Sequence, residues 1–116
     1  MEHTQDQAAL LAAFHLTWDG FPGVARLIDR NSKVLAVNPC GLKAGHKEGE
    51  TCSKVGKPEM HRSCLKAQVL RSQEPGLDRP NDQKIRGWVP IQGFPDLVVH
   101  FALVVPETGK NNFNVQ

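Results

Sequence analysis

An apolar run near the C-terminus, Leu97 to Val105, constrains the fold more than any other segment of the chain. It contains four valines and one phenylalanine, residue types that favour extended strands. Alternate side chains of a strand point to opposite faces, and here both faces are apolar: Leu97, Val99, Phe101, Leu103 and Val105 lie on one, and Val98, Ala102 and Val104 on the other. Such a strand is covered on both faces. We therefore expect a layered domain, in which an N-terminal helix or a partner subunit covers the second face.

Two hairpins are predicted from β-rich runs separated by turn residues. The first joins Val24–Asp29 to Lys33–Asn38 through Arg30-Asn31-Ser32, and the second joins Lys84–Gln92 to Leu97–Val105 through Gly93-Phe94-Pro95-Asp96. We expect one antiparallel sheet of about five strands, of which these runs delimit four.

The N-terminal segment predicts a helix from about Asp6 to Trp18. Thr4-Gln5-Asp6-Gln7 has the form of a capping box, and apolar residues then recur at helical spacing. The resulting apolar stripe consists of Leu10, Leu11, Phe14 and Trp18. It makes the helix amphipathic, and it either covers the domain's own sheet or packs against a second copy.

A second helix is predicted from Glu59 to about Ser72, because Pro58 suits a first-turn position and Glu74-Pro75-Gly76 would end it. Between Asn38 and Gly56 the chain is irregular, with room for short helical turns only. The fold class is therefore α+β, an antiparallel sheet with helices on one face and the N-terminal helix in addition.

The length and the net charge of the chain exclude some classes of function. A chain of 116 residues makes one small domain, and its net charge of +2 is dispersed, so nucleic acid is not an expected partner. The polar N-terminus has no secretory signal and no run is long enough to span a membrane, which predicts a cytoplasmic protein. The sequence has no glycine-rich phosphate-binding loop. We expect solvent to surround the carboxylates of Glu48, Glu50, Asp78 and Asp82 and the imidazoles of His3 and His46. For these reasons we do not expect the chain to be an enzyme.

The sequence feature that most indicates a metal or redox site is a cluster of potential ligands: Cys40, followed by Cys52-x8-His61-x2-Cys64. Thiolate and imidazole are ligands of zinc and of iron–sulfur clusters, and on the predicted helix His61 and Cys64 would share a face. The alternatives are that the thiols are small buried hydrophobes, Cys40 above all, or that Cys52 and Cys64 form a reversible disulfide. A Cys64–His61 nucleophile–base pair with Asp78 or Asp82 is disfavoured, because neighbours on one helix rarely align for catalysis.

The chain resembles a PAS domain over about residues 20 to 106. The resemblance rests on Val24–Asp29 followed by Lys33–Pro39, which is similar to the family's opening hairpin with its terminal Asn, on Gly45–Glu50, on one long helix, and on Trp88-Val89-Pro90-Ile91. It implies a sensor that binds a small ligand between the sheet and the helical loops, and that signals through a homodimer or an output protein. Residues 1–19 would then form the dimerisation or covering helix, and residues 107–116 a polar tail.

The resemblance also bears on the cysteine cluster. Some PAS-like domains have a Cys and then Cys-x-x-Cys at the start of the long helix, which implies a zinc or iron–sulfur site made by Cys52, His61, Cys64 and Cys40. Haem-binding members use a helix histidine, which implies His61 as the haem ligand. The residues around Cys52 differ from those around the flavin-adduct cysteine of light sensors. A cofactor-free interaction module is the remaining alternative.

Overall fold

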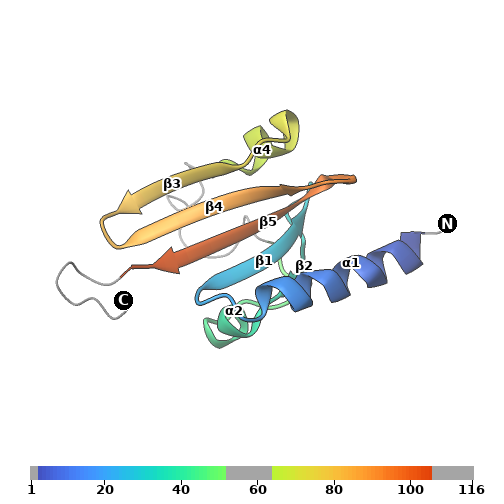
Figure 1. Cartoon of the computed structure of the whole chain (residues 1–116), viewed down its shortest axis with the longest axis horizontal. Coiled ribbons are helices and arrows are strands. Elements are labelled where there is room, and N and C mark those ends of the chain that lie inside the picture. The colour runs from blue at the N-terminus through green and yellow to red at the C-terminus, as the bar shows by residue number, and fades with distance from the viewer. Residues whose placement is uncertain (1–2, 52–63, 106–116) are drawn as a thin grey trace, which may run out of the picture.

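The computed structural model describes residues 3–51 and 64–105. Its elements are α1 (His3–Trp18), β1 (Val24–Asp29), β2 (Val34–Val37), α2 (Pro39–Lys43), α4 (Lys66–Ser72), β3 (Gly76–Asn81), β4 (Lys84–Ile91) and β5 (Phe94–Val104). They form one five-stranded sheet flanked by helices (Figure 1). Among these described elements, no helix combines the length and apolar character needed to cross a bilayer.

The sheet is antiparallel and has the order β2-β1-β5-β4-β3. Both predicted hairpins are present, β1 with β2 and β4 with β5, and the last strand pairs in the middle of the sheet. The predicted four-residue turn is wrong: Phe94–Asp96 belong to β5, and Gln92 and Gly93 alone make the turn. Gly93 has φ 87°, which a glycine adopts without strain, so a tight connection is available.

The sequence of strand β3 lacks the alternation of apolar and polar residues from which a strand is predicted. Its sequence is Gly-Leu-Asp-Arg-Pro-Asn, and its side chains are mostly exposed. Pro80 lacks the amide donor of an inner strand, but β3 lies at the edge of the sheet, where one side of the strand needs no partner. The strand therefore forms through its pairing with β4 rather than through burial.

Both predicted helices start elsewhere. Helix α1 begins at His3, so Thr4 lies within the helix instead of capping it, while its end at Trp18 is as predicted. Helix α4 begins at Lys66, and Cys64 and Leu65 precede it in non-helical conformation. The predicted start at Glu59 lies outside the described residues, and a continuous helix from there to Ser72 is wrong because Cys64 and Leu65 interrupt it.

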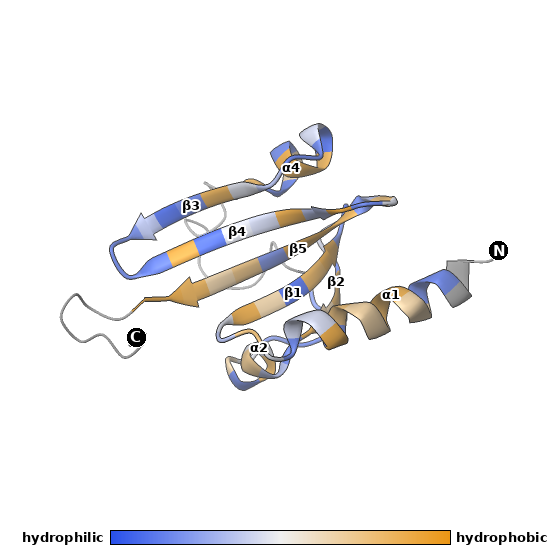
Figure 2. Cartoon of the chain, viewed as in Figure 1, coloured by the Kyte–Doolittle hydropathy of each residue, from blue (hydrophilic) through white to orange (hydrophobic). Residues whose placement is uncertain are grey.

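The sheet buries apolar side chains on both faces, as the two-sided β5 strand predicts. On the face covered by α1, here called the outer face, the buried residues are Phe14, Ala25, Leu27, Ala36 and Val99. On the opposite, inner face they are Ile28, Val34, Val37, Trp88 and Val98, with Val69 of α4 packed over them. The N-terminal stripe thus packs on the domain's own sheet. Figure 2 shows the hydrophobic centre formed by β1 and β5.

A single buried side chain, that of Asn38, connects elements from both layers. Its Oδ1 accepts hydrogen bonds from the amides of Ala25 and Gly41, each at 2.9 Å. Its Nδ2 donates to the carbonyl of Gly23 at 2.9 Å and to that of Trp18 at 3.1 Å. Asn38 therefore caps α2 while holding the start of β1 and the end of α1.

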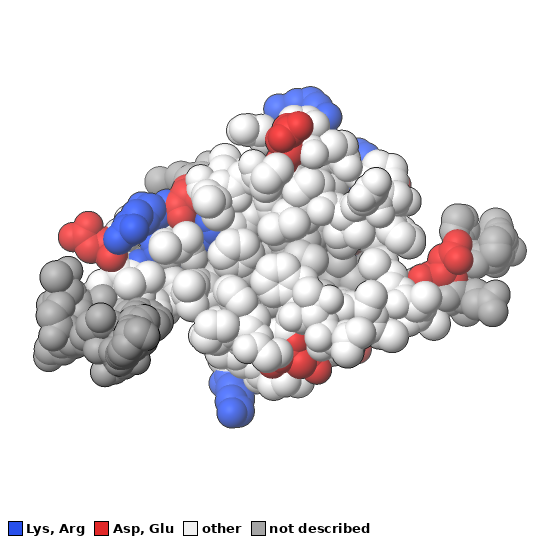
Figure 3. Space-filling view, viewed as in Figure 1, with Lys and Arg blue, Asp and Glu red and all other residues white. Residues whose placement is uncertain are grey.

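Helix α1 leaves part of the outer face open. Trp18 stacks on Phe101 with ring centroids 5.9 Å apart, which marks the limit of the covered area. Beyond it, towards β3, Leu77 is 66% exposed. Figure 3 shows that the centre of the visible surface has no charged residues and that the charges lie around its periphery.

Candidate functional site on the inner face

The inner face of the sheet carries a row of polar and aromatic side chains across four strands. Arg26 of β1 is opposite His100 of β5, and His100 is opposite Trp88 of β4. The next register position places Arg86 of β4 opposite Asp78 of β3. Directly opposed residues share a face and touch across the strands. The row thus brings two arginines, one histidine and one carboxylate onto a face that otherwise forms an apolar core.

His100 is held in one orientation. Its ring stacks on that of Trp88, with centroids 4.5 Å apart and planes at 6°, and its Nδ1 lies 2.8 Å from the carbonyl oxygen of Gly87. A carbonyl can only accept, so Nδ1 carries the proton and donates it. Burial, and then the charges of Arg26 and Arg86, lower the pKa of His100 from 6.5 to about 4, against the raising effect of the Gly87 bond. His100 is therefore neutral at physiological pH.

Arg86 is paired with Asp78 of the neighbouring strand. Its Nε donates to Oδ1 of Asp78 at 2.9 Å, and its Nη2 donates to Oδ2. The guanidinium carbon also lies 5.3 Å from the centroid of Trp88, within range of a cation–π contact. Asp78 is only 24% exposed, so the expectation that it is solvated is wrong. This ion pair fixes the β3 end of the row.

Arg26 is buried without such a partner. Its residue is 7% exposed, and its Nε and Nη1 are inaccessible and make no hydrogen bond within the part of the chain that the structure describes. An ionised group removed from water is costly unless it is paired. Among the described side chains of this face, Arg26 therefore has two buried donors, Nε–H and Nη1–H, without a hydrogen-bond partner.

A second pair lies near Arg26. Nδ1 of His46, in the segment after α2, is 3.3 Å from Oε2 of Glu50, and their side chains are 21% and 14% exposed. Burial and the charge of Arg26 lower the pKa of His46, although Glu50 acts in the opposite direction. Both residues were expected to be solvated, and both are half-buried instead.

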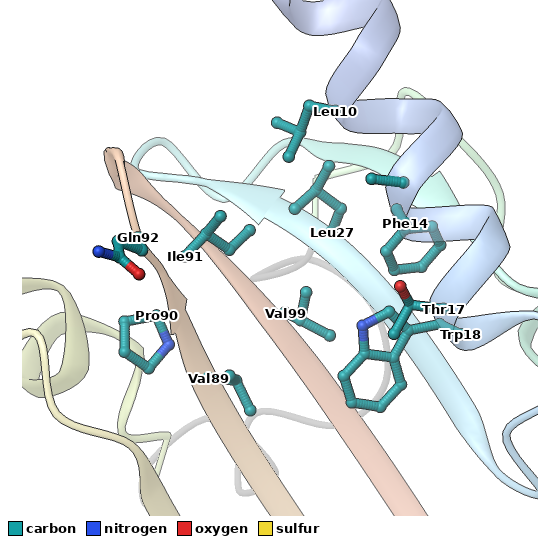
Figure 4. Close-up of a pocket in the computed structure, with 11 residues that line it drawn as sticks. Leu10, Phe14, Thr17, Trp18, Leu27, Val89, Pro90, Ile91, Gln92 and Val99 are labelled. Carbon is teal, nitrogen blue, oxygen red and sulfur yellow. The ribbon is translucent and has the colours of Figure 1, made fainter.

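The outer face contains an open groove of about 280 Å³ between α1 and β4. Leu10, Phe14 and Trp18 project into it from the helix, and Leu27, Val89, Ile91 and Val99 from the strands (Figure 4). Its lining is almost entirely apolar, and it has none of the charged groups of the inner face. The two faces thus offer different chemistry.

Two solved structures share this architecture. The PAS domain of BvgS from Bordetella pertussis matches with a TM-score of 0.65 at 19% sequence identity, over 86% of this chain and 89% of that one. A sensory box sensor histidine kinase from Vibrio cholerae matches with a TM-score of 0.63 at 9% identity, over 91% and 96%. The chain has the PAS fold. No protein-family model and no curated protein matches the sequence.

The PAS fold confirms the resemblance drawn from the hairpins and the Asn at residue 38 at the level of architecture. In this fold the predicted cysteine cluster is described only in part. Cys40 lies in α2 and Cys64 just before α4; both are half-buried free thiols, and Cys64 packs against the inner core. Cys52 and His61 lie outside the described residues. Within residues 3–51 and 64–105, no three potential metal ligands come together, so the four-ligand site stays a prediction.

Sequence reasoning overlooked Arg26, although a signal was present. The run Val24-Ala25-Arg26-Leu27-Ile28 alternates, so a charge at its centre shares a face with Val24 and Ile28. A charged residue that shares its face of a strand with apolar residues lies either at the edge of the sheet or in the core, and charged residues are almost never fully buried without a partner. In this PAS fold β1 has a neighbouring strand on each side, and Arg26 is buried.

Proposed function

We propose that this chain is a non-enzymatic sensory domain that binds a small ligand on the inner face of its sheet. The observation that supports this most is the buried Arg26, whose Nε and Nη1 have no partner among the described residues. The neighbouring His100 and Trp88 form a rigid, stacked wall, which suits a preorganised binding surface. The signal would leave through a second copy of the chain or through an output protein.

Ligand binding is testable because each face of the sheet has one tryptophan, Trp88 on the inner and Trp18 on the outer face. A small-molecule library is first screened for compounds that raise the thermal unfolding midpoint of the full chain. Hits are then titrated into Trp18→Phe, in which Trp88 is the sole reporter, and into the matched Trp88→Phe variant. We expect hits to change the emission of Trp88 and not that of Trp18.

The opposite result, a change of Trp18 emission alone, would place the ligand in the outer groove and contradict the proposal. A library without hits would favour the cofactor-free interaction module. Protein denatured directly after purification and analysed by mass spectrometry shows whether a ligand was retained from the cell.

The proposed dimer uses the outer face. The stripe of α1 packs on the domain's own sheet, yet the opposite side of this helix is also largely apolar: Ala8, Ala9 and Ala12 are exposed, and Leu16 is 89% exposed. Apolar residues grouped on an exposed surface often mark an interaction site. A second copy, related by a two-fold axis, would cover this side and the uncharged surface beside it.

A metal or haem site remains the second proposal, supported by the position of Cys64 against the inner core. Anaerobically purified protein would be examined by metal analysis and by an ultraviolet–visible spectrum. Stoichiometric zinc without colour, a thiolate-to-iron band or a Soret band would identify zinc, an iron–sulfur cluster or haem. Cys52→Ser, His61→Ala and Cys64→Ser should each lose the group, and Cys40→Ser tests the fourth ligand. Metal-free, colourless protein contradicts this proposal.

A further inference from the structure

We propose that the ligand of the inner face is a small monocarboxylate with an apolar body, and that the guanidinium of Arg26 binds its carboxylate. This inference rests on the proposed ligand-binding function and adds the chemical class of the ligand. Three features of the inner face support it: the unused donors of Arg26, the balance of charge around it, and the apolar surface next to it.

Nε–H and Nη1–H of Arg26 lie on different edges of a planar guanidinium, both are inaccessible to water, and neither has a partner among the described residues. Hydrogen bonds from an arginine to an oxyanion are about twice as strong as neutral ones, because both partners are charged. An oxyanion such as a carboxylate, bound at one of these edges, would therefore compensate part of the burial of Arg26.

The described charged side chains of the inner face have an excess of positive charge, which indicates the charge expected of a ligand. Among the described residues, the side chains whose charges act on His46 and His100 are the cations Arg26, Lys84 and Arg86 and the carboxylates Glu50 and Asp78. Asp78 is paired with Arg86, and Glu50 with the imidazole of His46. With both histidines neutral, these described side chains comprise three cations and two carboxylates, which leaves one positive charge among them. A monoanion balances this charge, whereas a phosphate group at neutral pH would bring more than one.

The surroundings of Arg26 indicate the rest of the ligand. Ile28 and Val98 lie one register position further along the same face, and Trp88 follows His100 in the row. These side chains are at most 1% exposed. A polar or second charged end would be buried there without a partner, so the body next to the carboxylate should be apolar.

The test compares matched pairs of carboxylates and amides: acetate, butyrate and benzoate with acetamide, butyramide and benzamide. Each compound is added at pH 7.5 with chloride held constant. The thermal midpoint is recorded for the full chain, and Trp88 emission for the Trp18→Phe variant. We expect at least one carboxylate to raise the midpoint while its amide does not. Arg26→Met, which replaces the guanidinium by an apolar, unbranched side chain, should bind that carboxylate about tenfold more weakly or worse.

The stability of the ligand-free protein provides an independent readout. If Arg26 is unpaired, Arg26→Met should raise the thermal midpoint, because an apolar side chain of similar size is easier to bury. A lower midpoint for Arg26→Met would show that the protein itself pairs this guanidinium, and would overturn the inference.

The remaining outcomes also decide between the two proposals. Amides that bind as well as carboxylates, or inorganic phosphate that binds better, would overturn the monocarboxylate and leave a ligand-binding sensor. The absence of any response to the three carboxylates at millimolar concentration overturns the inference as well. The proposed function fails separately, when the broader library has no hit that changes Trp88 emission.

Discussion

His100 couples the stability of the domain to pH. Its pKa is about 4 in the folded chain, lowered mainly by burial, whereas the unfolded chain titrates near 6.5. Between these values the unfolded state binds more protons, so stability falls as the pH falls. We expect a loss of roughly 3 kcal/mol from this group between pH 7 and pH 4, with His46 acting in the same direction because its pKa is also lowered.

Urea unfolding at a series of pH values measures this effect. The comparison is with His100→Gln, which offers a donor to the Gly87 carbonyl but does not titrate. The difference in unfolding free energy between the two proteins should shrink as the pH is lowered through this window. A difference that is constant with pH would mean that His100 is not buried as a neutral group.

Gly23 is fixed by its neighbour across the sheet. A Cβ added at this position would lie 2.3 Å from the backbone carbonyl oxygen of Ala102, which cannot move without displacing β5. We expect Gly23→Ala to lower the unfolding free energy by about 1–3 kcal/mol. Gly20→Ala is the matched control, since a Cβ there meets nothing within 4 Å. Equal stability of the two variants in urea would contradict this packing.

Among the elements, the short helix α2 depends on its cap. Asn38→Ala removes four hydrogen bonds and leaves the amides of Ala25 and Gly41 and the carbonyls of Gly23 and Trp18 without that partner. The expected loss is about 2–4 kcal/mol, because unsatisfied buried groups cost more than the bond itself.

Two comparisons make the Asn38 prediction specific. Asn38→Asp retains the acceptor for Ala25 and Gly41 but cannot donate to the two carbonyls, so it should also be destabilising. Asn31→Ala, in the exposed turn after β1, should change stability little. Chemical denaturation of all three variants checks this order, and an Asn38→Ala protein as stable as Asn31→Ala would refute it.

The elements that sequence reasoning predicted best are those with a strong local signal. The strands of the two hairpins have alternating β-branched residues, and their pairing follows from short connections. Strand β3 has no such signal, because its pairing with β4 replaces burial. The start of α4 was placed too early, since proline at residue 58 and the residues after it have adequate helix propensity, whereas tertiary packing of Cys64 and Leu65 on the inner core decides their conformation.

At the scale of the molecule, the two faces of the sheet have different proposed roles: the inner face binds the ligand and the outer face forms the dimer. The inner face carries the charged row, and the outer face is apolar and carries α1. Sequence patterns predicted that both faces would be covered, and left open whether α1 or a partner covers the second. They could not predict the row from Arg26 to Asp78, because it depends on which strands are neighbours: β1 and β5 are about 70 residues apart in sequence.

The proposed dimer leads to a prediction at this scale. Leu16→Glu places a charge on the exposed side of α1 and should convert a dimer to a monomer, with little effect on folding because Leu16 is 89% exposed. Leu42→Glu is the matched control: Leu42 is 55% exposed and lies on α2, which packs with the inner layer. Sedimentation velocity measures both. An unchanged mass for Leu16→Glu, or an equal loss for Leu42→Glu, would exclude α1 from the interface.

The side chain of Asn38 also determines where this chain can be shortened. A fragment that starts at Gly20 would lack Trp18, whose carbonyl accepts from Nδ2, and the aromatic ring that stacks on Phe101. Helix α1 is thus joined by hydrogen bonding to a residue of the first hairpin and by packing to the central strand, although it precedes both in the sequence. A boundary drawn at residue 20, where the resemblance to other domains begins, would cut through the folded unit rather than beside it.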